Sequence, residues 1–279
     1  MNLRNANKVE NYRGVKILME TALLGHGLHS IKNEQIAAQW PEATSVELVW
    51  LQAGQIKTGG IAEFLSIRLA GQEWKRANSN NLAAMINARQ NAFLTVSALI
   101  ALFDNEDNKS IIVTAGLGGI RDNTISADLQ VIRKSHVVVF ASAFKDVINY
   151  EQTFNYINEN KINIGGWKNS VFDGFIFRHP LAYKLKSIDE ESLYRQMQKN
   201  NHVIILNGIP LPNRIDDSGI LQQARQAGEE GGKQGEQFHP AVNKALDQLT
   251  AGKSSELQLQ ALVDNLSAAG ELLDMMQTK

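Results

Sequence analysis

The chain has 279 residues, enough to bury a large core as one sizeable α/β domain or two smaller ones. Its 28 basic and 29 acidic residues leave a net charge of −1, which excludes a global field attracting nucleic acid or an anionic membrane. It contains no cysteine, so disulfides, zinc thiolate sites and cysteine nucleophiles are excluded together. No stretch approaches the roughly 18 apolar residues that span a bilayer, and polar residues 1–8 are not typical of a signal peptide. We therefore expect a cytoplasmic protein with neither nucleic acid nor membrane as a partner.

Short apolar runs alternate with longer amphipathic segments along most of the chain. In chain order, we expect a strand over 46–51, a turn at 53–55, one or two helices over 82–103, a strand over 111–114, a buried strand over 137–145, a helix over 153–160 and a strand over 203–206. This alternation predicts a layered α/β/α fold with a central, largely parallel or mixed sheet.

The composition changes from about Ile215 onward, where Gln, Glu, Ala and Leu dominate. Residues 228–235 are rich in Gly and Glu and are interpreted as a flexible insert. Residues 240–248 and 257–276 have helical periodicity and predict two closing C-terminal helices. We expect residues 1–279 to form one domain.

The most informative segment is Ile125-Ser-Ala-Asp-Leu129 with the apolar, β-branched run that follows it and ends on Lys145. Ligands bind at the carboxyl ends of strands in α/β folds, so a lysine at that position is well placed for chemistry. In an apolar setting its ammonium loses hydration and its pKa falls, which leaves free amine to attack a carbonyl. The alternative is a lysine whose charged end extends from a strand end into water.

A glycine cluster, Gly116-Leu-Gly-Gly119, follows the predicted strand 111–114. Without Cβ atoms its backbone can approach a ligand closely. The spacing is not that of a dinucleotide-binding fingerprint, because the third glycine comes too early. A tight turn from strand to loop is an equally good interpretation.

Several short motifs stand in a fixed order along the chain. They are Met19-Glu-Thr21 with Gly25-His-Gly27, Gly54-Gln-Ile-Lys-Thr-Gly59, Thr114-Ala-Gly-Leu-Gly-Gly-Ile120, Ile125-Ser-Ala-Asp-Leu129 with Lys145, and Asn207-Gly-Ile-Pro210. Their order and spacing resemble those of the pseudouridine-5′-phosphate glycosidases, over roughly residues 15 to 275. No single motif is decisive.

The resemblance implies reversible cleavage of the carbon–carbon glycosidic bond of pseudouridine 5′-phosphate to uracil and ribose 5-phosphate. A C-glycosidic bond has no heteroatom leaving group, so an ordinary pair of glycosidase carboxylates is insufficient. An imine at C1′ makes the sugar an electron sink and allows the carbon bond to break. By resemblance Lys145 is the nucleophile and Glu20 the proton donor. The alternative for Glu20 is a surface residue at a strand end.

Further contacts are carried over by the same resemblance. The substrate-binding positions fall on Arg76, Val96, Thr114, Ser126, Ala127, Asp128 and Asn265. Arg76 stands where the family has a lysine that meets the phosphate, and it keeps that charge. The implied partners are ribose 5-phosphate or a C-nucleoside 5′-phosphate, and the implied assembly is a homo-oligomer, a trimer. His26 is equally well interpreted as a residue hydrogen-bonded within its turn.

The chain departs from the family pattern at the position implied for a manganese ion. The family's metal-binding aspartate is replaced by Thr124, and a hydroxyl is a poor ligand for a hard divalent ion. Asp122 or Asp128 is an alternative ligand, and Arg121 an alternative source of charge. Whether a metal is bound stays open.

A second departure lies at Gly165–Phe172, where a changed segment predicts a changed aglycone, larger or more apolar than uracil. Retained catalytic residues in altered surroundings also fit relatives that synthesise C-nucleosides or C-glycosides. Two further alternatives are a catalytically degenerate protein that binds a sugar phosphate or a partner, and an aldolase-type lyase that uses Lys145 on another sugar phosphate.

Overall fold

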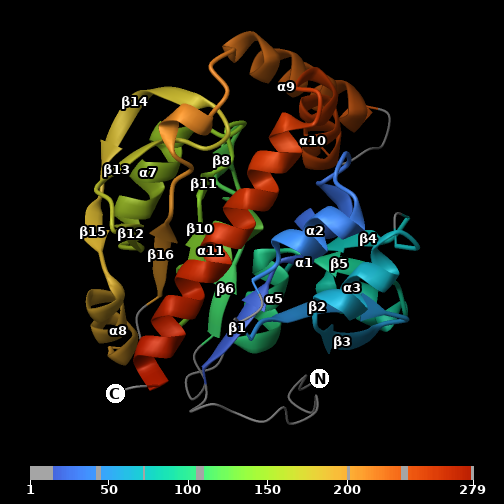
Figure 1. Cartoon of the computed structure of the whole chain (residues 1–279), viewed down its shortest axis with the longest axis horizontal. Coiled ribbons are helices and arrows are strands. Elements are labelled where there is room, and N and C mark those ends of the chain that lie inside the picture. Colours follow the sequence, from blue (N-terminus) through green and yellow to red (C-terminus); the bar gives the residue numbers. More distant parts are fainter. Residues whose placement is uncertain are drawn as a thin grey trace.

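The computed structural model describes residues 15–41, 45–71, 73–104, 110–199, 202–233 and 238–277. The strands of its main sheet are β1 (Lys16–Met19), β2 (Glu47–Gln52), β3 (Gln55–Gly59), β4 (Lys75–Ala77), β5 (Ala92–Leu94), β6 (Ser110–Val113), β10 (Val138–Ala141), β12 (Asn163–Trp167), β15 (Lys186–Ile188) and β16 (Val203–Leu206). They form a 10-stranded sheet in the order β15-β12-β16-β10-β6-β1-β2-β5-β4, with β3 paired to β2 (Figure 1).

Three small pairs of strands complete the β-structure described. They are β7 (Gly116–Leu117) with β11 (Ala143–Phe144), β8 (Ile120–Arg121) with β9 (Thr124–Ile125), and β13 (Val171–Gly174) with β14 (Arg178–Lys184). The helices are α1 (Thr21–His26), α2 (Asn33–Gln39), α3 (Ile61–Arg68), α4 (Leu82–Asn87), α5 (Val96–Phe103), α6 (Ala127–Ile132), α7 (Tyr150–Glu159), α8 (Glu190–Gln198), a 3₁₀ turn (Leu211–Asn213), α9 (Ser218–Lys233), α10 (Phe238–Leu249) and α11 (Lys253–Gln277).

The centre of the main sheet is parallel and, apart from Lys16 at the start of β1, buried. Strands β1, β6, β10 and β16 are neighbours that run in one direction, and β2 is antiparallel to β3 and β5. Their continuous apolar sequences suit strands covered on both faces. The predicted layered α/β fold with a largely parallel sheet is confirmed.

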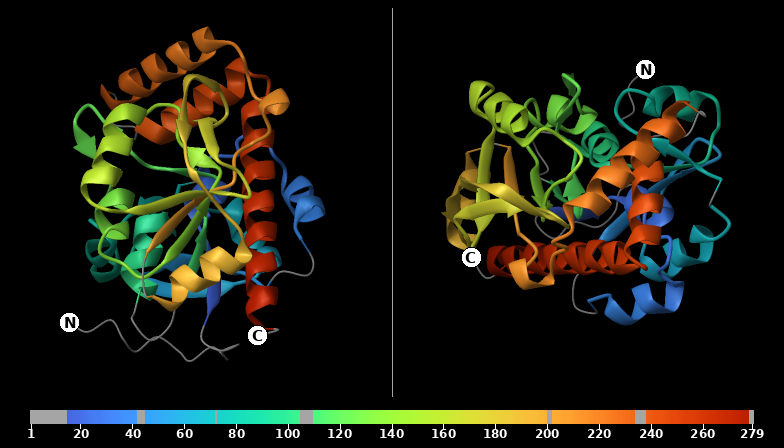
Figure 2. Two further views of the ribbon diagram at one scale, coloured as in Figure 1. Left: turned by 90° about the vertical axis from the view of Figure 1, so that its left-hand side faces the viewer. Right: turned by 90° about the horizontal axis from the view of Figure 1, so that it is seen from above.

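Helices cover both faces of the sheet and one end of it. In the left view of Figure 2, α11 lies on one face and α7 on the other. The α9–α10 pair lies across the end toward which β10 leads into β11 (Figure 1). Within the described ranges, no helix combines the length and apolar character needed to cross a membrane.

Two predicted elements are divided in the structure. Residues 82–103 form the two helices α4 and α5, but Ala92–Leu94 between them joins the sheet as β5. The predicted strand 137–145 is wrong as one element, because it breaks at Ser142 into β10 and β11. Ser142 donates its backbone N–H to Ala115 O (2.8 Å), which turns the chain from the main sheet toward β7.

The predicted flexible insert at 228–235 is also wrong over most of its length. Residues 228–233 continue α9, and 234–235 lie outside the described residues. Gly228 is buried, and a Cβ there would lie 2.5 Å from Val242 Cγ2 of α10. The glycine therefore allows two helices to pack closely. The two predicted closing helices are confirmed as α10 and α11.

Candidate active site

Three neighbouring parallel strands end at one edge of the sheet, and each is followed by a polar residue. Glu20 follows β1, Thr114 follows β6 and Ser142 follows β10. The backbone N–H of Glu20 donates to Val113 O (3.0 Å), and that of Thr114 donates to Phe140 O (2.9 Å). The parallel register thus places these side chains side by side at the carboxyl ends, where ligands bind in such sheets.

Glu20 is held in a nearly water-free position. Its side chain is 4% exposed and forms an ion pair with Arg76 Nη2 at 3.2 Å. The Thr114 hydroxyl donates a hydrogen bond to the other carboxylate oxygen. A buried carboxylate requires such partners, since an unpaired charge there costs several kcal/mol. The interpretation of Glu20 as a surface residue at a strand end is wrong, because burial excludes it.

Asn265 joins this edge from the C-terminal helix α11. Its Nδ2 donates to Thr114 O (2.7 Å) and to Ser142 Oγ (3.1 Å), and the residue is fully buried. Its Oδ1 has no hydrogen-bond partner among the described residues. Buried polar atoms rarely lack a partner, so this acceptor is available to a donor group on a ligand.

Lys145 follows β11 and lies within the same cluster. Its backbone N–H donates to Leu117 O (3.0 Å). Burial lowers the pKa of its ammonium, and the charge of Arg76 adds to this, while Glu20 and Asp128 act in the opposite direction. Desolvation outweighs the two carboxylates, so Lys145 has a larger fraction of free amine than an exposed lysine.

The glycine cluster brings functional side chains close to the backbone. A Cβ on Gly116 would lie 3.1 Å from Lys145 Cγ and 2.8 Å from Phe175 Cε1. A Cβ on Gly118 would lie 3.0 Å from Asp128 Oδ2. The neighbouring side chains therefore leave too little room for a Cβ atom at either glycine.

The Ser-Ala-Asp motif forms the start of α6. Ser126 caps the helix by accepting from Leu129 N (3.3 Å), and Ala127 is the first helical residue. Asp128 accepts from Gly118 N (3.2 Å) and from Ser97 N (3.0 Å). The hydrogen bond from Ser97 N holds the first turn of α5 against the Ser-Ala-Asp motif.

That turn of α5 contains Val96, which is 1% exposed. The structure therefore brings together Glu20, Arg76, Val96, Thr114, Ser126, Ala127, Asp128, Lys145 and Asn265 around one strand edge. Their individual roles stay predictions.

The position implied for manganese does not offer a fitting set of ligands. Thr124 is exposed and pairs with Arg121 across the β8–β9 hairpin, whose turn residues Asp122 and Asn123 have φ of 49° and 60°. Asp122 pairs with Arg121 at 3.5 Å, and Asp128 accepts two backbone N–H groups. In the described part of the chain, no group of three or more His, Asp or Glu residues could hold a metal ion.

Asp146 is a buried carboxylate that the sequence analysis did not single out. It accepts from the N–H groups of Phe175 (3.1 Å), Ile176 (3.0 Å) and Phe177 (3.3 Å), and from Tyr150 Oη (3.1 Å). Burial raises its pKa to about 6 despite these bonds. Because Phe175 also packs beside Gly116, Asp146 fixes one wall next to Lys145.

A second residue outside the predicted set is His239, in the first turn of α10. Its pKa is lowered well below the usual value, by burial first and then by the charges of Lys145, Arg76 and Arg121. The amphipathic pattern of this helix gave no signal for a site residue, whereas Asp146 stood directly beside Lys145 in the sequence.

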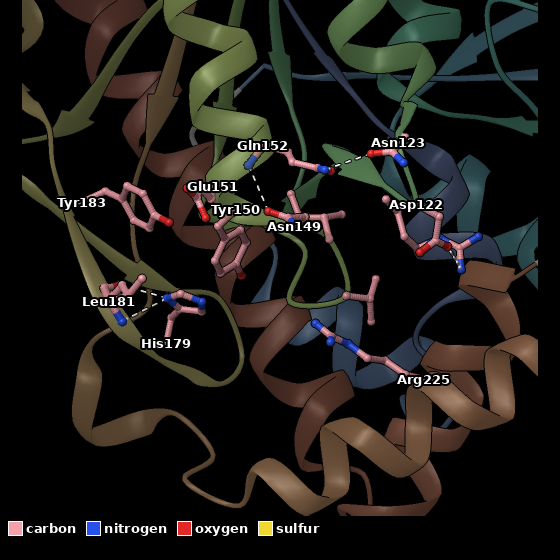
Figure 3. A pocket seen from close by; sticks show the side chains of 13 residues that line it. Asp122, Asn123, Asn149, Tyr150, Glu151, Gln152, His179, Leu181, Tyr183 and Arg225 are labelled. Carbon is pink, nitrogen blue, oxygen red and sulfur yellow. Dashed lines mark hydrogen bonds and ion pairs between the residues drawn. The ribbon is translucent and has the colours of Figure 1, made fainter.

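A separate cavity of about 600 Å³ opens beside the 147–152 segment (Figure 3). Tyr150, His179 and Tyr183 lie on one side of the view, and Arg225 extends in from α9. Arg225 Nη2 donates to Asp146 O at 2.5 Å, which attaches α9 to the residue after Lys145. Lys145 is not among the residues that line this cavity, whereas Val147 and Ile148, close to it in sequence, are.

The changed segment at Gly165–Phe172 contributes its rings to the core. Trp167 packs edge-on to Phe140 with centroids 5.2 Å apart. Phe172 lies 5.0 Å from the Tyr150 ring and 6.2 Å from Phe144. These rings stabilise the strands behind Lys145.

The fold and cluster define an α/β protein with a desolvated lysine and a buried, paired glutamate at the carboxyl edge of a parallel sheet. The chain belongs to the indigoidine synthase A-like protein family, whose model matches residues 7–273. A pseudouridine-5′-phosphate glycosidase from Legionella pneumophila is 22% identical over 283 residues, covering 94% of this chain and 91% of the relative. Another from Thermotoga maritima is 23% identical over 268 residues, covering 91% and 92%. The predicted family is confirmed.

Two crystal structures share the fold. An indigoidine synthase A-like protein from Thermotoga maritima has a TM-score of 0.77 at 20% identity, covering 98% of this chain and 100% of the other. The prealnumycin C-glycosynthase AlnA, in complex with ribulose 5-phosphate, has a TM-score of 0.73 at 16% identity, covering 94% and 92%. The family thus contains enzymes of C-glycosidic bonds.

The exchange of Asp146 for asparagine tests its positioning role. We expect Asp146→Asn to lower the free energy of unfolding by about 2–4 kcal/mol at pH 7, because an amide group cannot accept at both positions and leaves buried N–H groups unpaired. Urea denaturation measures this, with exposed Asp216→Asn as the matched control.

The stabilities of wild type and Asp146→Asn should also depend differently on pH, and the pKa of Asp146 fixes the direction of that difference. Folding raises the pKa of Asp146 from 3.8 to about 6, so the folded state binds the extra proton between these values. The stability contributed by Asp146 is full below the lower value and is lost as pH rises through the upper one. The stability difference between wild type and Asp146→Asn should therefore shrink from pH 4.5 to pH 7; a constant difference contradicts the assignment.

Proposed function

We infer that this protein forms or breaks the carbon–carbon bond between C1′ of a ribose 5-phosphate unit and a carbon aglycone, through an imine on Lys145. The observation that carries this inference is the desolvated Lys145 amine in one cluster with the buried Glu20. The family membership supports it, since relatives carry the names pseudouridine-5′-phosphate glycosidase and C-glycosynthase.

In the bond-forming direction, the free amine of Lys145 adds to the C1 aldehyde of open-chain ribose 5-phosphate and water leaves, giving an imine. The protonated imine accepts the electron pair of the aglycone carbon, which gives up its proton, and the pair of the C–N double bond returns to nitrogen. The C4 hydroxyl then attacks C1, displaces the amine and closes the ring. Cleavage is the reverse sequence, in which water finally hydrolyses the imine.

Glu20 is placed to move protons during these steps. In cleavage it donates a proton to the ring oxygen as the furanose opens, and in synthesis it accepts a proton as the ring closes. Arg76 and Thr114 hold its carboxylate in one orientation. Asn265 offers its unpartnered Oδ1 to a sugar hydroxyl.

The physiological direction and the aglycone define two forms of this proposal. The glycosidase form releases a nucleobase or other carbon aglycone in the cytoplasm, and the synthase form joins it to ribose 5-phosphate. Incubation in each direction, followed by chromatography of the C-nucleoside 5′-phosphate, distinguishes them. The alternative, a protein that binds the sugar phosphate without forming an imine, predicts no adduct in the trapping experiment below.

The imine is tested by reductive trapping. Incubation with ribose 5-phosphate and borohydride should add one reduced ribose 5-phosphate to the wild type, because the amine attacks the sugar aldehyde. Intact-mass spectrometry should show this adduct in wild type and in exposed Lys57→Ala, but not in Lys145→Ala. No adduct in the wild type, or an equal adduct in Lys145→Ala, contradicts the proposal.

Glu20→Gln separates proton transfer from imine formation. The amide keeps the shape of the side chain but cannot donate a proton, so kcat should fall about 10²–10⁴-fold. The borohydride adduct should persist, since Lys145 is intact. Rapid-quench kinetics with Glu34→Gln as an exposed control measures both properties. A kcat within about threefold of wild type removes Glu20 from this role.

The family resemblance also supports a homotrimer. Sedimentation equilibrium at several concentrations should give three times the monomer mass, and a stable monomer mass contradicts the assignment. The candidate active-site residues at the strand edge all come from one chain. We therefore expect the protein, when diluted to a monomer, still to form the borohydride adduct on Lys145.

A further inference from the structure

The cavity of about 600 Å³ in Figure 3 is bounded by segments that lie far apart in the sequence, and its size is that of a small-molecule site. Residues 147–152 and the β8–β9 hairpin form two of its walls. A third wall is β14, from which His179, Leu181 and Tyr183 line the cavity. Since alternate residues of a strand share one face, β14 turns a single face toward the cavity.

Aromatic rings form one side of this cavity and are fixed from behind. The Tyr150 and His179 rings meet edge to face with centroids 4.7 Å apart, and the Tyr183 ring lies 6.3 Å from that of His179. Phe154, which does not line the cavity, stacks on Tyr183 at 4.3 Å with the two planes 12° apart. It covers one face of that ring, so Tyr183 meets the cavity with its other face and its edge. Rings held in this way can pack against a flat ligand at little cost in side-chain entropy.

Arg225 brings a positive charge into the cavity from α9, as Figure 3 shows. Its Nη2 donates to Asp146 O at 2.5 Å. Among the ion pairs of the residues that the structure describes, none involves Arg225. A guanidinium has five N–H donors in a planar fork, and one carbonyl oxygen occupies only one of them. The remaining donors can therefore bind a carboxylate.

The two acids that line the cavity are not paired with this guanidinium. Asp122 pairs with Arg121 at 3.5 Å on the hairpin. Burial raises the pKa of the Tyr183 hydroxyl, and the negative charge of Glu151 beside it adds to this. Figure 3 shows Glu151 and Tyr183 together, apart from Arg225. The cavity thus has a cation at one end and a carboxylate at the other, which disfavours a ligand with negative groups at both ends.

We propose that this cavity binds a planar aromatic monocarboxylate that carries a hydroxyl group at the opposite end of its ring. The carboxylate accepts hydrogen bonds from the guanidinium of Arg225, and the hydroxyl donates to Glu151. The ring packs against Tyr183 and His179. The proposal goes beyond the proposed function, because it assigns a ligand to a cavity that the residues clustered around Lys145 do not line.

The first experiment measures binding by calorimetry at pH 7 with three compounds of similar shape. We expect 4-hydroxyphenylacetate to bind with a dissociation constant below about 1 mM. Its alcohol, 2-(4-hydroxyphenyl)ethanol, lacks the carboxylate, and (4-hydroxycyclohexyl)acetate lacks the aromatic ring. Each should bind at least about tenfold more weakly. No binding of the aromatic acid, or equal binding of all three, overturns the proposal. None of them has an aldehyde, so the result is independent of imine formation on Lys145.

The second experiment places the bound acid by substitution. Arg225→Gln should weaken binding of 4-hydroxyphenylacetate at least about tenfold and abolish the preference for the acid over the alcohol. Tyr183→Leu should weaken both compounds and keep that preference, since it removes the ring and leaves the cation. Exposed Arg195→Gln, on α8, is the matched control and should bind as the wild type does.

The preference for the acid also separates binding from folding. Arg225 holds the carbonyl of Asp146, so thermal unfolding of each variant is recorded by circular dichroism before binding is measured. A purely structural role of Arg225 would lower the affinity for acid and alcohol alike. An unchanged preference for the acid in Arg225→Gln therefore overturns the proposal, as does an equal loss in Arg195→Gln.

Discussion

The burial of the Glu20 carboxylate is the constraint on which the site depends. A charge 4% exposed must be compensated locally, and the partners come from the neighbouring strand β6, through Thr114, and from β4 across the sheet, through Arg76. These bonds connect two distant parts of the main sheet at one edge. The same groups then set the electrostatic surroundings of Lys145, since Arg76 and Glu20 act on its amine with opposite signs.

The C-terminal helices complete a site whose reacting residues come earlier in the chain. Asn265 of α11 ties the ends of β6 and β10 together through Thr114 and Ser142. Arg225 of α9 bonds to the carbonyl of Asp146, and Phe238 of α10 packs against Arg121. The strand edge alone would leave these groups in water, so the helices supply the desolvation that lowers the pKa of Lys145.

The sequence predicted the parts of this protein that depend on local pattern. Apolar β-branched runs at 111–114 and 203–206 gave buried strands, and the position of Lys145 at a strand end followed from the same pattern. The break at Ser142 was not predictable, because it depends on bonds to Ala115 and Asn265, far away in sequence. Gly228 was misread as flexible, since a glycine that permits close helix packing has the composition of a loop until the partner helix is known.

The same limit explains the site residues that were missed. His239 carries no motif, and its importance comes from the charges that the fold places around it. Asp146 was visible beside Lys145, but its role required knowing that three successive N–H groups from 175–177 converge on it. Motif order found the residues that resemble the family, and only the three-dimensional arrangement drew attention to Asp146 and His239.

Burial favours the neutral forms of both Lys145 and Asp146, and this gives the site its chemical character. Adjacent in sequence, the two residues are moved toward their neutral forms: the pKa of the amine falls and that of the carboxyl rises to about 6. For Lys145 the neutral form is the nucleophile. For Asp146 the ionised form accepts all four hydrogen bonds, so near neutral pH those bonds sustain a charge that burial opposes. One desolvated turn therefore contains the reactive amine of Lys145 and the carboxylate of Asp146, which fixes the wall next to that amine. Both groups require the overlying helices to exclude water.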